Sequence, residues 1–234
     1  EWTISEKRDD MYFKTVLFDF DGTLIDTSEG ILKSLECAFV ENDREVPSEH
    51  FLRKFIGPPL RSSFIEYCGM DEDETKAMIA SFKRVYGETG LFDSKVYDGI
   101  IKLVKNLNDC GVNTGIVSLK PRVMIDRLVK HFGMEDLFSY IYGTIYDGDS
   151  DKSTVIREAA DYFKTGTSDT LMVGDRMYDI DGAHKAGFKC AGAVYGCGTK
   201  EELVEHNADY LLYAPTDLEQ IVRTGKEDLF FACF

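Results

Sequence analysis

Two aspartates, one residue apart, follow a short apolar run near the start of the chain. Residues 16–18 form this run, Asp19 and Asp21 come after it, and Gly22 follows directly. Strand-forming apolar residues that end in glycine predict a buried strand running into a tight turn. An exposed Asp-Gly turn is the alternative interpretation, but a carboxylate at the end of a buried run is costly without a partner. The pair therefore indicates a site that holds a cation.

Three later segments carry polar side chains where a strand or turn gives way to a helix. Ser118 ends one apolar stretch, Asp175 ends another with Asp179 one helical turn beyond, and Lys152 follows an acidic turn. Ordinary structural roles remain open, because Ser118 and Asp179 are good helix caps and a lysine is usually exposed. The helix dipole disfavours a lysine at a helix N-terminus, so a function in neutralising carboxylates or phosphate is favoured for Lys152.

The elements that must position these residues are parallel strands. Beyond residue 96, stretches with helical spacing alternate with short apolar stretches, which is typical of an α/β sheet. We expect strands at 16–18, 113–118, 140–144, 170–174, 189–194 and 210–211. We expect helices at 98–109 with Asp98 as the cap, from Lys120 to about 131, and from 152, 199 and 216. Because ligands of such sheets bind outside the carboxyl ends of the strands, the polar residues are expected there.

The segment after the first strand has a different character. Between residues 28 and 92 no strong strand pattern occurs, and helices are expected from Thr27 or Ser28, and over 48–55, 60–67 and 72–86. An all-helical insert predicts a separate lobe that acts as a lid. Gly57 and two prolines fix a rigid turn before Arg61. That turn is either a plain loop between helices or a device that points Arg61 at a substrate anion.

Composition excludes several classes of partner. The 234 residues carry a formal net charge of −15, which disfavours nucleic acid and anionic membranes. No apolar run approaches the roughly 20 residues that span a bilayer, and the N-terminus lacks a signal pattern. We therefore expect a cytoplasmic protein without nucleic-acid or membrane partners. Residues 1–10 and 227–234 are expected to be terminal extensions, the latter unusually apolar.

The cysteines indicate reduced thiols. They are scattered, without a CxxC pair or a zinc-like spacing, and most are expected in or near the core. Cys197, between two glycines, is expected to be the most exposed. The six are Cys37, Cys68, Cys110, Cys190, Cys197 and Cys233.

Four segments in order resemble the motifs of the haloacid dehalogenase superfamily. Residues 19–27 match its first motif, DxDGTLxDT, and Ser118 with Lys120 and Pro121 match the second, although Leu119 departs from the commoner Thr-Asn-Lys-Pro. Lys152 opens a segment similar to the third motif. Residues 174–183 are similar to the GDRxYDIxGA form of the fourth. Residues 56–61, IGPPLR, resemble a segment of the phosphoglycolate phosphatase-like branch with a helical cap.

The resemblance implies a role for each matching residue. Asp19 corresponds to the nucleophile that takes a phosphoryl group, and Asp21 to the acid/base. The backbone N–H of Gly22, the Ser118 hydroxyl and the Lys152 ammonium correspond to groups that hold the phosphoryl oxygens. These five positions are expected to carry the chemistry.

The resemblance also implies a metal and substrate contacts. Magnesium would be bound by Asp19, by Asp175 and by the backbone carbonyl of Asp21, with Asp179 binding through water or orienting the site. Arg61 and Lys120 are further candidates for substrate binding.

The expected fold is α/β, with a Rossmann-like parallel sheet core and an inserted all-helical cap. Residues 11–27 and 93–226 would form the core and residues 28–92 the cap. The expected function is a magnesium-dependent phosphatase acting on a small phosphorylated metabolite, such as a phosphoglycolate-like compound, a nucleotide or a sugar phosphate. A phosphoglucomutase-like phosphotransferase and a non-catalytic phosphate-binding regulatory protein are the alternatives. Either a monomer or a homodimer fits these features.

Overall fold

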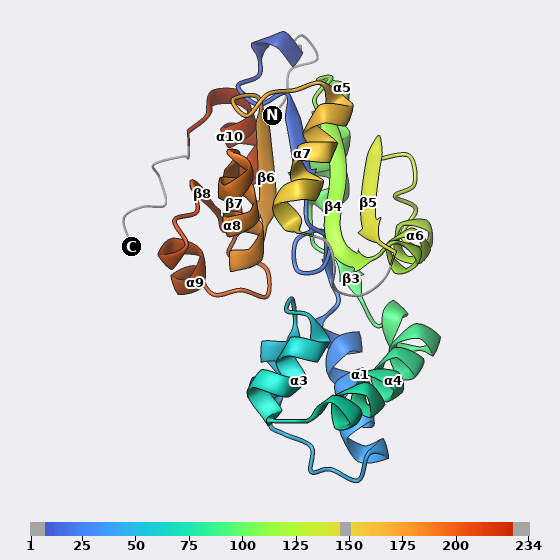
Figure 1. The fold of residues 1–234 in the computed structure, drawn as a ribbon. Helices are drawn as coiled ribbons and strands as arrows, with labels where there is room; N and C mark the ends of the chain where they lie inside the picture. Colours follow the sequence, from blue (N-terminus) through green and yellow to red (C-terminus); the bar gives the residue numbers. More distant parts are fainter. Residues whose placement is uncertain (1–7, 146–150, 227–234) are drawn as a thin grey trace. The chain divides into compact units, whose positions relative to one another are not determined.

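The chain folds into two compact units, which differ in secondary structure. The structure is a computed structural model that describes residues 8–145 and 151–226. The first unit consists of residues 1–24 and 96–234, and the second of residues 25–95. Figure 1 shows a sheet with flanking helices in the first unit and mainly helices in the second. The apolar tail and Cys233 lie outside the described residues.

A six-stranded parallel sheet forms the centre of the first unit, which confirms the expected α/β fold. Its strand order is β5-β4-β1-β6-β7-β8. The strands are β1 (Thr15–Phe18), β4 (Asn113–Pro121), β5 (Tyr140–Thr144), β6 (Thr170–Gly174), β7 (Lys189–Ala193) and β8 (Tyr210–Leu212). Strand β1 lies between β4 and β6, and all four of its residues are buried. A strand covered on both faces is apolar throughout, which explains the continuous run in the sequence.

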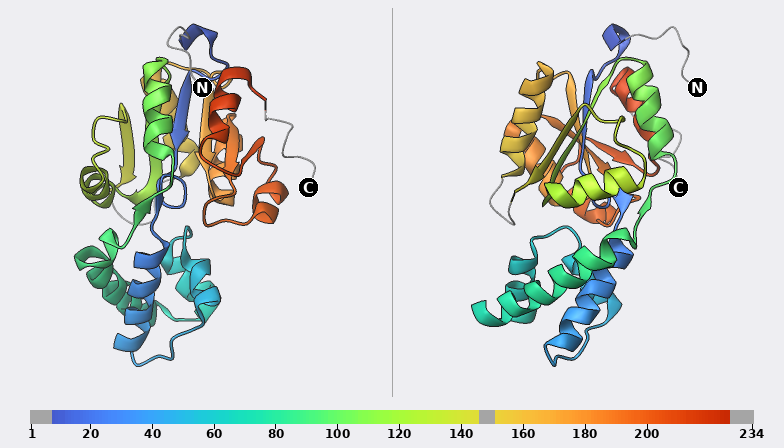
Figure 2. Two further views of the ribbon diagram at one scale, coloured as in Figure 1. Left: turned by 180° about the vertical axis from the view of Figure 1, so that it is seen from behind. Right: turned by 90° about the vertical axis from the view of Figure 1, so that its right-hand side faces the viewer.

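Helices cover both faces of this sheet. Figure 2 shows α7 and α8 on one face and α5 and α10 on the other. The helices of the unit are η1 (Arg8–Asp10), α5 (Ile100–Asp109), α6 (Arg122–His131), α7 (Lys152–Phe163), α8 (Met177–Ala186), α9 (Lys200–Glu205) and α10 (Asp217–Thr224). Helices α5 to α9 link parallel strands of the sheet, as crossover connections require, while η1 precedes the first strand and α10 follows the last.

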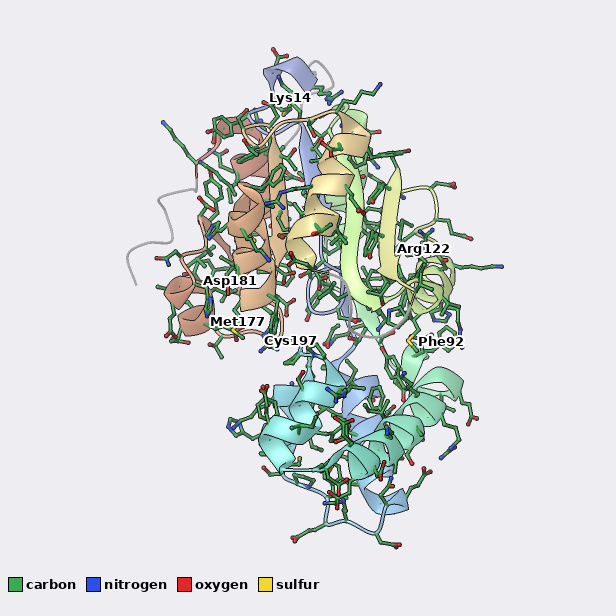
Figure 3. The ribbon with its side chains drawn as sticks, viewed as in Figure 1. Lys14, Phe92, Arg122, Met177, Asp181 and Cys197 are labelled. Atoms are coloured by element: carbon green, nitrogen blue, oxygen red, sulfur yellow. The ribbon has the colours of Figure 1, made fainter. Side chains whose placement is uncertain are left out.

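Two helix starts differ from the sequence-based expectation. Strand β4 continues through Lys120, and α6 begins only at Arg122, which is labelled in Figure 3. The proline at 121 explains this, because a residue that precedes proline is disfavoured in the helical region. Helix α5 is preceded by Gly99 at φ 91°, with no side-chain cap, so the expected cap by Asp98 is wrong. A left-handed residue at this point suits glycine.

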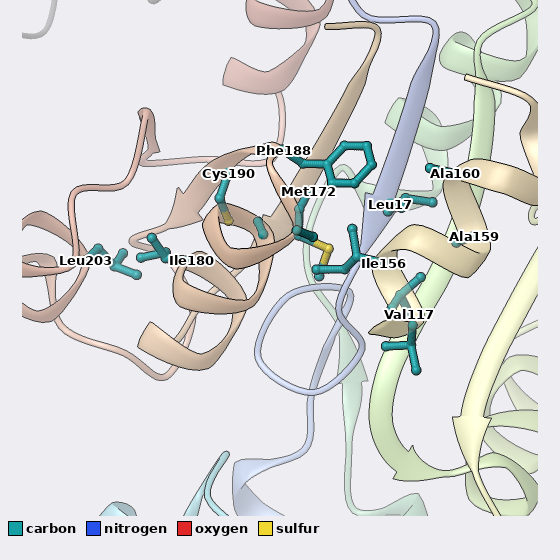
Figure 4. Close-up of a cluster of buried hydrophobic side chains, with 13 residues drawn as sticks. Leu17, Val117, Ile156, Ala159, Ala160, Met172, Ile180, Phe188, Cys190 and Leu203 are labelled. Atoms are coloured by element: carbon teal, nitrogen blue, oxygen red, sulfur yellow. The ribbon is translucent and has the colours of Figure 1, made fainter. Parts of the chain in front are cut away.

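A cluster of apolar side chains fixes α7 and α8 against the sheet (Figure 4). Leu17, Val117 and Met172 come from three neighbouring strands, and Ile156 and Ile180 come from the two helices. Each is essentially inaccessible to solvent. Burying one such side chain contributes roughly 1.5–3 kcal/mol. The cluster therefore holds the N-terminal ends of α7 and α8 at fixed positions beside the strand ends.

The second unit is mainly helical. Its elements are β2 (Ile25–Asp26), α1 (Ser28–Glu41), α2 (Glu49–Leu52), η2 (Arg53–Phe55), α3 (Leu60–Cys68), α4 (Glu72–Glu88) and η3 (Gly90–Phe92), with β3 (Lys95–Val96) paired to β2 where the chain returns to the first unit. Phe55 and Phe64 pack with ring centroids 5.0 Å apart, and Phe39 lies 6.2 Å from Phe64. These rings give the unit an aromatic core of its own.

The start of α1 and the exposure of the cysteines both differ from what the sequence predicted. Thr27 precedes α1 without a side-chain cap, and Asp26 instead accepts the Ser28 N–H at 3.1 Å. Among the five cysteines that the structure describes, Cys37 is exposed and Cys197 is half-buried, so the expectation that Cys197 is the most exposed was wrong. In α1, Cys37 occupies a position outside the apolar stripe. Among the described residues, no helix is long and apolar enough to span a membrane.

Candidate active site

Asp19 leaves β1 at the point where the strand ends between β4 and β6. Its backbone N–H donates to the Val173 carbonyl at 2.8 Å, which continues the sheet ladder by one residue. The chain then turns at Gly22, whose φ is +80°. A Cβ at this position would lie 2.1 Å from Asp175 Oδ2. Only glycine allows the turn after β1 to approach the end of β6 this closely.

Lys152 joins two carboxylates at the start of α7. Its ammonium Nζ lies 2.6 Å from Asp19 Oδ1 and 2.8 Å from Asp179 Oδ1, and its side chain is 6% exposed. Helix α8 leaves room for it, because a Cβ at Gly182 would lie 2.8 Å from Lys152 Cβ. Burial alone would lower the pKa of Lys152, but the charges of Asp179 and Asp19 outweigh it and raise the pKa. The lysine therefore stays charged between its partners.

Asp179 serves both as a cap and as a member of the site. Its Oδ2 accepts the Arg176 N–H at 3.2 Å in the first turn of α8, while its Oδ1 faces Lys152. Burial raises the pKa of Asp179 to about 6, against the lowering effect of Lys152. The two interpretations from the sequence, helix cap and site residue, are thus compatible.

Asp175 is buried at the end of β6 and is held by neutral donors. Thr23 Oγ1 donates to its Oδ1 at 3.2 Å, and the Cys197 N–H donates to its Oδ2 at 2.9 Å. Burial raises the pKa of Asp175 well above its usual range, and the charges of Asp179 and Asp19 raise it further. This carboxylate therefore lies in a crowded acidic environment.

The carboxylates fit a divalent cation. One oxygen each of Asp19, Asp175 and Asp179 lie within 4.8 Å of one another. With Asp21, four carboxylates face two lysine ammoniums, which leaves two negative charges when all are ionised. Oxygen ligands of this kind are those that Mg²⁺ prefers. A bound divalent ion would balance the charge that raises the pKa values of the buried pair.

Asp21 lies beside a second lysine. Lys120 Nζ is 3.0 Å from both Asp21 Oδ1 and Asp21 Oδ2. The Lys120 side chain is 5% exposed and that of Asp21 is 20% exposed. Ser118, on the same strand, is buried, and its Oγ accepts the Lys120 N–H at 3.3 Å. The first unit therefore brings Ser118 and Lys120 to the same strand end, with Lys120 paired to Asp21.

Arg61 belongs to the second unit. It lies in the first turn of α3, where its guanidinium pairs with Glu72, and its side chain is 60% exposed. The other sequence-predicted site residues all lie in the first unit.

Sequence reasoning gave no role to the loop after β7. Tyr195 Oη donates to the Thr23 carbonyl at 3.0 Å, and Cys197 holds Asp175 through its backbone N–H. A Cβ at Gly196 would lie 2.4 Å from Asp175 Cβ, and a Cβ at Gly198 1.9 Å from the Asp175 carbonyl oxygen. Figure 3 shows Cys197 and Met177 at the end of the first unit where the strands end. The glycines on each side of Cys197 are the sequence signal for such a close backbone approach.

Comparisons with known proteins find relatives that cover most of the chain. Residues 16–193 match the haloacid dehalogenase-like hydrolase family. A 5'-nucleotidase from Pseudomonas aeruginosa is 33% identical over 213 residues, covering 91% of this chain and 96% of that protein. The pyrophosphatase PpaX of Bacillus pumilus is 32% identical over 213 residues, 89% of this chain and 95% of that protein. The crystal structure of a predicted phosphatase from Clostridium acetobutylicum has a TM-score of 0.82 at 37% identity and covers 89% of this chain and 97% of that one.

Proposed function

Because the chain belongs to the haloacid dehalogenase-like hydrolase family, we propose that it is a magnesium-dependent phosphatase for a small phosphorylated metabolite. The observation that carries the proposal is the arrangement around Lys152, whose ammonium contacts Asp19 and Asp179 while Asp175 lies within 4.8 Å of both carboxylates. Phosphoryl transfer needs a nucleophile in a site where negative charge is neutralised, and this arrangement supplies both.

Asp19 is the nucleophile in this proposal. An oxygen of its carboxylate forms a bond to phosphorus while the bond from phosphorus to the leaving alcohol breaks, which gives an aspartyl-phosphate. Asp21 donates a proton to the leaving oxygen and then accepts a proton from the water that attacks the aspartyl-phosphate. Free phosphate leaves and Asp19 is regenerated. Dividing the hydrolysis in this way replaces one difficult step by two easier ones.

The remaining residues bind charge. Ser118, Lys152 and the backbone N–H of Gly22 hold the phosphoryl oxygens. Asp19, Asp175, Asp179 and the backbone carbonyl of Asp21 are the groups that would hold Mg²⁺. When bound, the ion neutralises the charge of the phosphate and of the carboxylates. The fixed positions of Lys152 and Asp179, both buried, reduce the reorganisation that the reaction requires.

The second unit is the cap in this proposal, with Arg61 as its contact to the substrate. The relatives include a 5'-nucleotidase and a pyrophosphatase, which makes nucleoside monophosphates and pyrophosphate substrates to test beside phosphoglycolate and sugar phosphates. Each of these compounds is a small anion. A location in the cytoplasm is part of the proposal, because the scattered cysteines, without a CxxC pair, are expected to be reduced thiols.

A phosphate-release assay over this panel tests the proposed function. We expect hydrolysis with Mg²⁺, loss of hydrolysis with a chelator, and restoration by added Mg²⁺. The Asp19→Asn variant should lose about 10⁴-fold or more in kcat, as hydrolases do when a covalent nucleophile is removed. Asp161→Asn, a change of the same kind at an exposed position of α7, is the matched control. Full activity of Asp19→Asn would exclude Asp19 as the nucleophile, and transfer of phosphate to a sugar would favour a phosphotransferase.

A further inference from the structure

We propose that Lys120 is a positioning residue, which holds the carboxyl group of Asp21 in the orientation needed for its proton transfer to the leaving group. This inference rests on the proposed phosphatase function. It gives Lys120 a different role from the substrate contact that the sequence suggested, and it explains why a lysine is buried beside the acid/base residue.

The contact between the two side chains is symmetric. Lys120 Nζ lies 3.0 Å from each oxygen of the Asp21 carboxylate. The lysine side chain is 5% exposed, whereas a lysine that serves only solubility keeps its ammonium in water. A carboxylate with both oxygens on one ammonium loses rotational freedom about its side-chain bonds. The pair therefore fixes the direction of the acid/base group before a substrate arrives.

An irregularity in β4 aims Lys120 at Asp21. The pairing with β5 places Val117 opposite Tyr142 but Pro121 opposite Thr144. Between these two pairs β4 advances by four residues while β5 advances by only two, so β4 contains extra residues. Extra residues of this kind bend a strand and re-aim its side chains, and they are common beside active sites. The bent segment is held in place, because Thr144 Oγ1 donates to the Leu119 carbonyl at 3.2 Å. The position of Lys120 is thus built into the sheet.

The two lysines of the site serve different carboxylates. Lys152 contacts Asp19 and Asp179, and Lys120 contacts Asp21. In the proposed reaction Asp19 attacks phosphorus and Asp21 transfers a proton. The division of the lysines therefore follows the division of chemical roles, one lysine for the nucleophile and one for the acid/base.

This division predicts a dependence on the leaving group. Protonation by Asp21 accelerates the departure of an alkoxide, but a nitrophenolate departs readily without a proton. The hydrolysis of the aspartyl-phosphate, which also uses Asp21, is common to both esters, so the rate to compare is that of the first step, measured in a single turnover. We expect Lys120→Met to lower this rate for an alkyl phosphate about 10²-fold, the lower range for general acid–base catalysis, and for 4-nitrophenyl phosphate less than about threefold. A residue that binds the phosphate would instead raise KM for both esters alike.

The experiment compares the two esters in four variants. Lys120→Met tests the pair, Asp21→Asn gives the pattern expected when the acid is lost, and the double variant Lys120→Met/Asp21→Asn tests their coupling. Adding Lys120→Met to Asp21→Asn should not lower the rate of cleavage of the alkyl ester any further. Lys130→Met, at an exposed position of α6, is the matched control, and melting temperatures show that each variant is folded. If Lys120→Met does not fold because the charge of Asp21 is left buried without its partner, the double variant avoids this problem, since it removes both charges. Its rate is then compared with that of Asp21→Asn.

The outcomes separate this inference from the proposed function. If the wild-type protein hydrolyses neither ester, the proposed function is wrong. If the wild type is active and Lys120→Met lowers the rates for both esters equally or raises only KM, Lys120 does not position Asp21. The same conclusion follows if Lys120→Met lowers the rate as much in the Asp21→Asn background as in the wild type. The positioning role is supported if Lys120→Met lowers the rate only for the alkyl ester and has no effect on that rate in the Asp21→Asn background.

Discussion

At the scale of single residues, the site carboxylates differ in what stabilises their charge. Asp19 and Asp179 share Lys152, and Asp21 has Lys120. Asp175 instead accepts hydrogen bonds from a threonine hydroxyl and a backbone N–H, which are neutral donors. Its raised pKa follows from burial and from the neighbouring charges of Asp179 and Asp19. Among the three carboxylates that could hold a metal ion in the described part of the chain, Asp175 is thus the one that these neutral donors hold.

We predict that Asp175→Asn stabilises the metal-free protein while removing its activity. The amide keeps the shape of the side chain and removes one charge from the acidic cluster, which lowers the repulsion. Urea unfolding at pH 7.5 with a chelator should give a higher midpoint for the variant than for the wild type. Asp161→Asn on the surface of α7 should leave the midpoint nearly unchanged. A lower midpoint for Asp175→Asn would show that its hydrogen bonds outweigh the repulsion.

At the scale of elements, α7 and α8 position the site by their N-terminal turns. Asp151 caps α7 and places Lys152 as its first residue, and the first turn of α8 carries Asp179. The sequence predicted α7 from its apolar spacing, which is local, and for α8 it predicted only that Asp179 lies one turn beyond Asp175. It misplaced the start of α6, although Pro121 is a local signal against a helical Lys120. The pairing of β4 with β5 past Ser118, which extends the strand, is a long-range interaction that the local pattern does not record.

The contact between α7 and α8 gives a prediction for Gly182. A Cβ there would lie 2.8 Å from both Lys152 Cβ and Lys152 Cγ, close to the backbone end of the side chain where it cannot easily move. Gly182→Ala should therefore displace Lys152 and lower kcat at least about tenfold. Gly87→Ala in α4 is the matched control, because a Cβ there meets nothing within 4 Å and alanine favours helix by up to about 1 kcal/mol. Wild-type activity in Gly182→Ala would mean that α8 shifts to accept the methyl group.

The cap of α7 gives a prediction for pH. The Ser153 hydroxyl first, and then Lys185, lower the pKa of Asp151 to about 2. Since the folded pKa is below the ordinary value of about 3.9, the stabilising contribution is present above pH 4 and is lost as the pH falls toward 2. Carboxyl-carbon NMR of labelled aspartate should find Asp151 still ionised at pH 3. Ser153→Ala should raise this pKa more than Lys185→Met, and equal pKa values in both variants and the wild type would contradict the assigned cause.

At the scale of the whole molecule, the insert leaves the first unit complete. The Tyr97 N–H donates to the Leu24 carbonyl at 3.1 Å, so the chain leaves and re-enters the first unit at neighbouring points. The sheet and its apolar cluster lie entirely in that unit. The first unit has the features of a domain that folds on its own.

We predict that the first unit folds without the second. Replacing residues 25–95 by a short Gly-Ser linker should leave a cooperative thermal transition and the circular dichroism of an α/β protein. Because Asp19, Lys152 and Asp175 are retained, Mg²⁺ should raise the melting temperature of this shortened chain, and Asp175→Asn in it should abolish the rise. A chain without a cooperative transition would show that the second unit is needed for folding.

The sequence by itself determined the family and the parallel sheet, and it named the candidate residues of the site. Its four motifs are runs of neighbouring residues, and the match over residues 16–193 confirms the family they suggested. Apolar strands that end in Asp19 and Asp175 are likewise local features, so they could be predicted from one chain. Their roles in catalysis stay predictions for the experiments above.

Only the tertiary structure decided which of these groups touch. Lys120 lies 99 residues from Asp21, and the Cys197 N–H lies 22 residues from Asp175. Such pairs depend on strand register, on the bend in β4 and on backbones that glycines allow to approach closely, and these arise from the sum of many packing contacts. The sequence names the groups that carry charge, and the three-dimensional packing determines which charges neutralise one another.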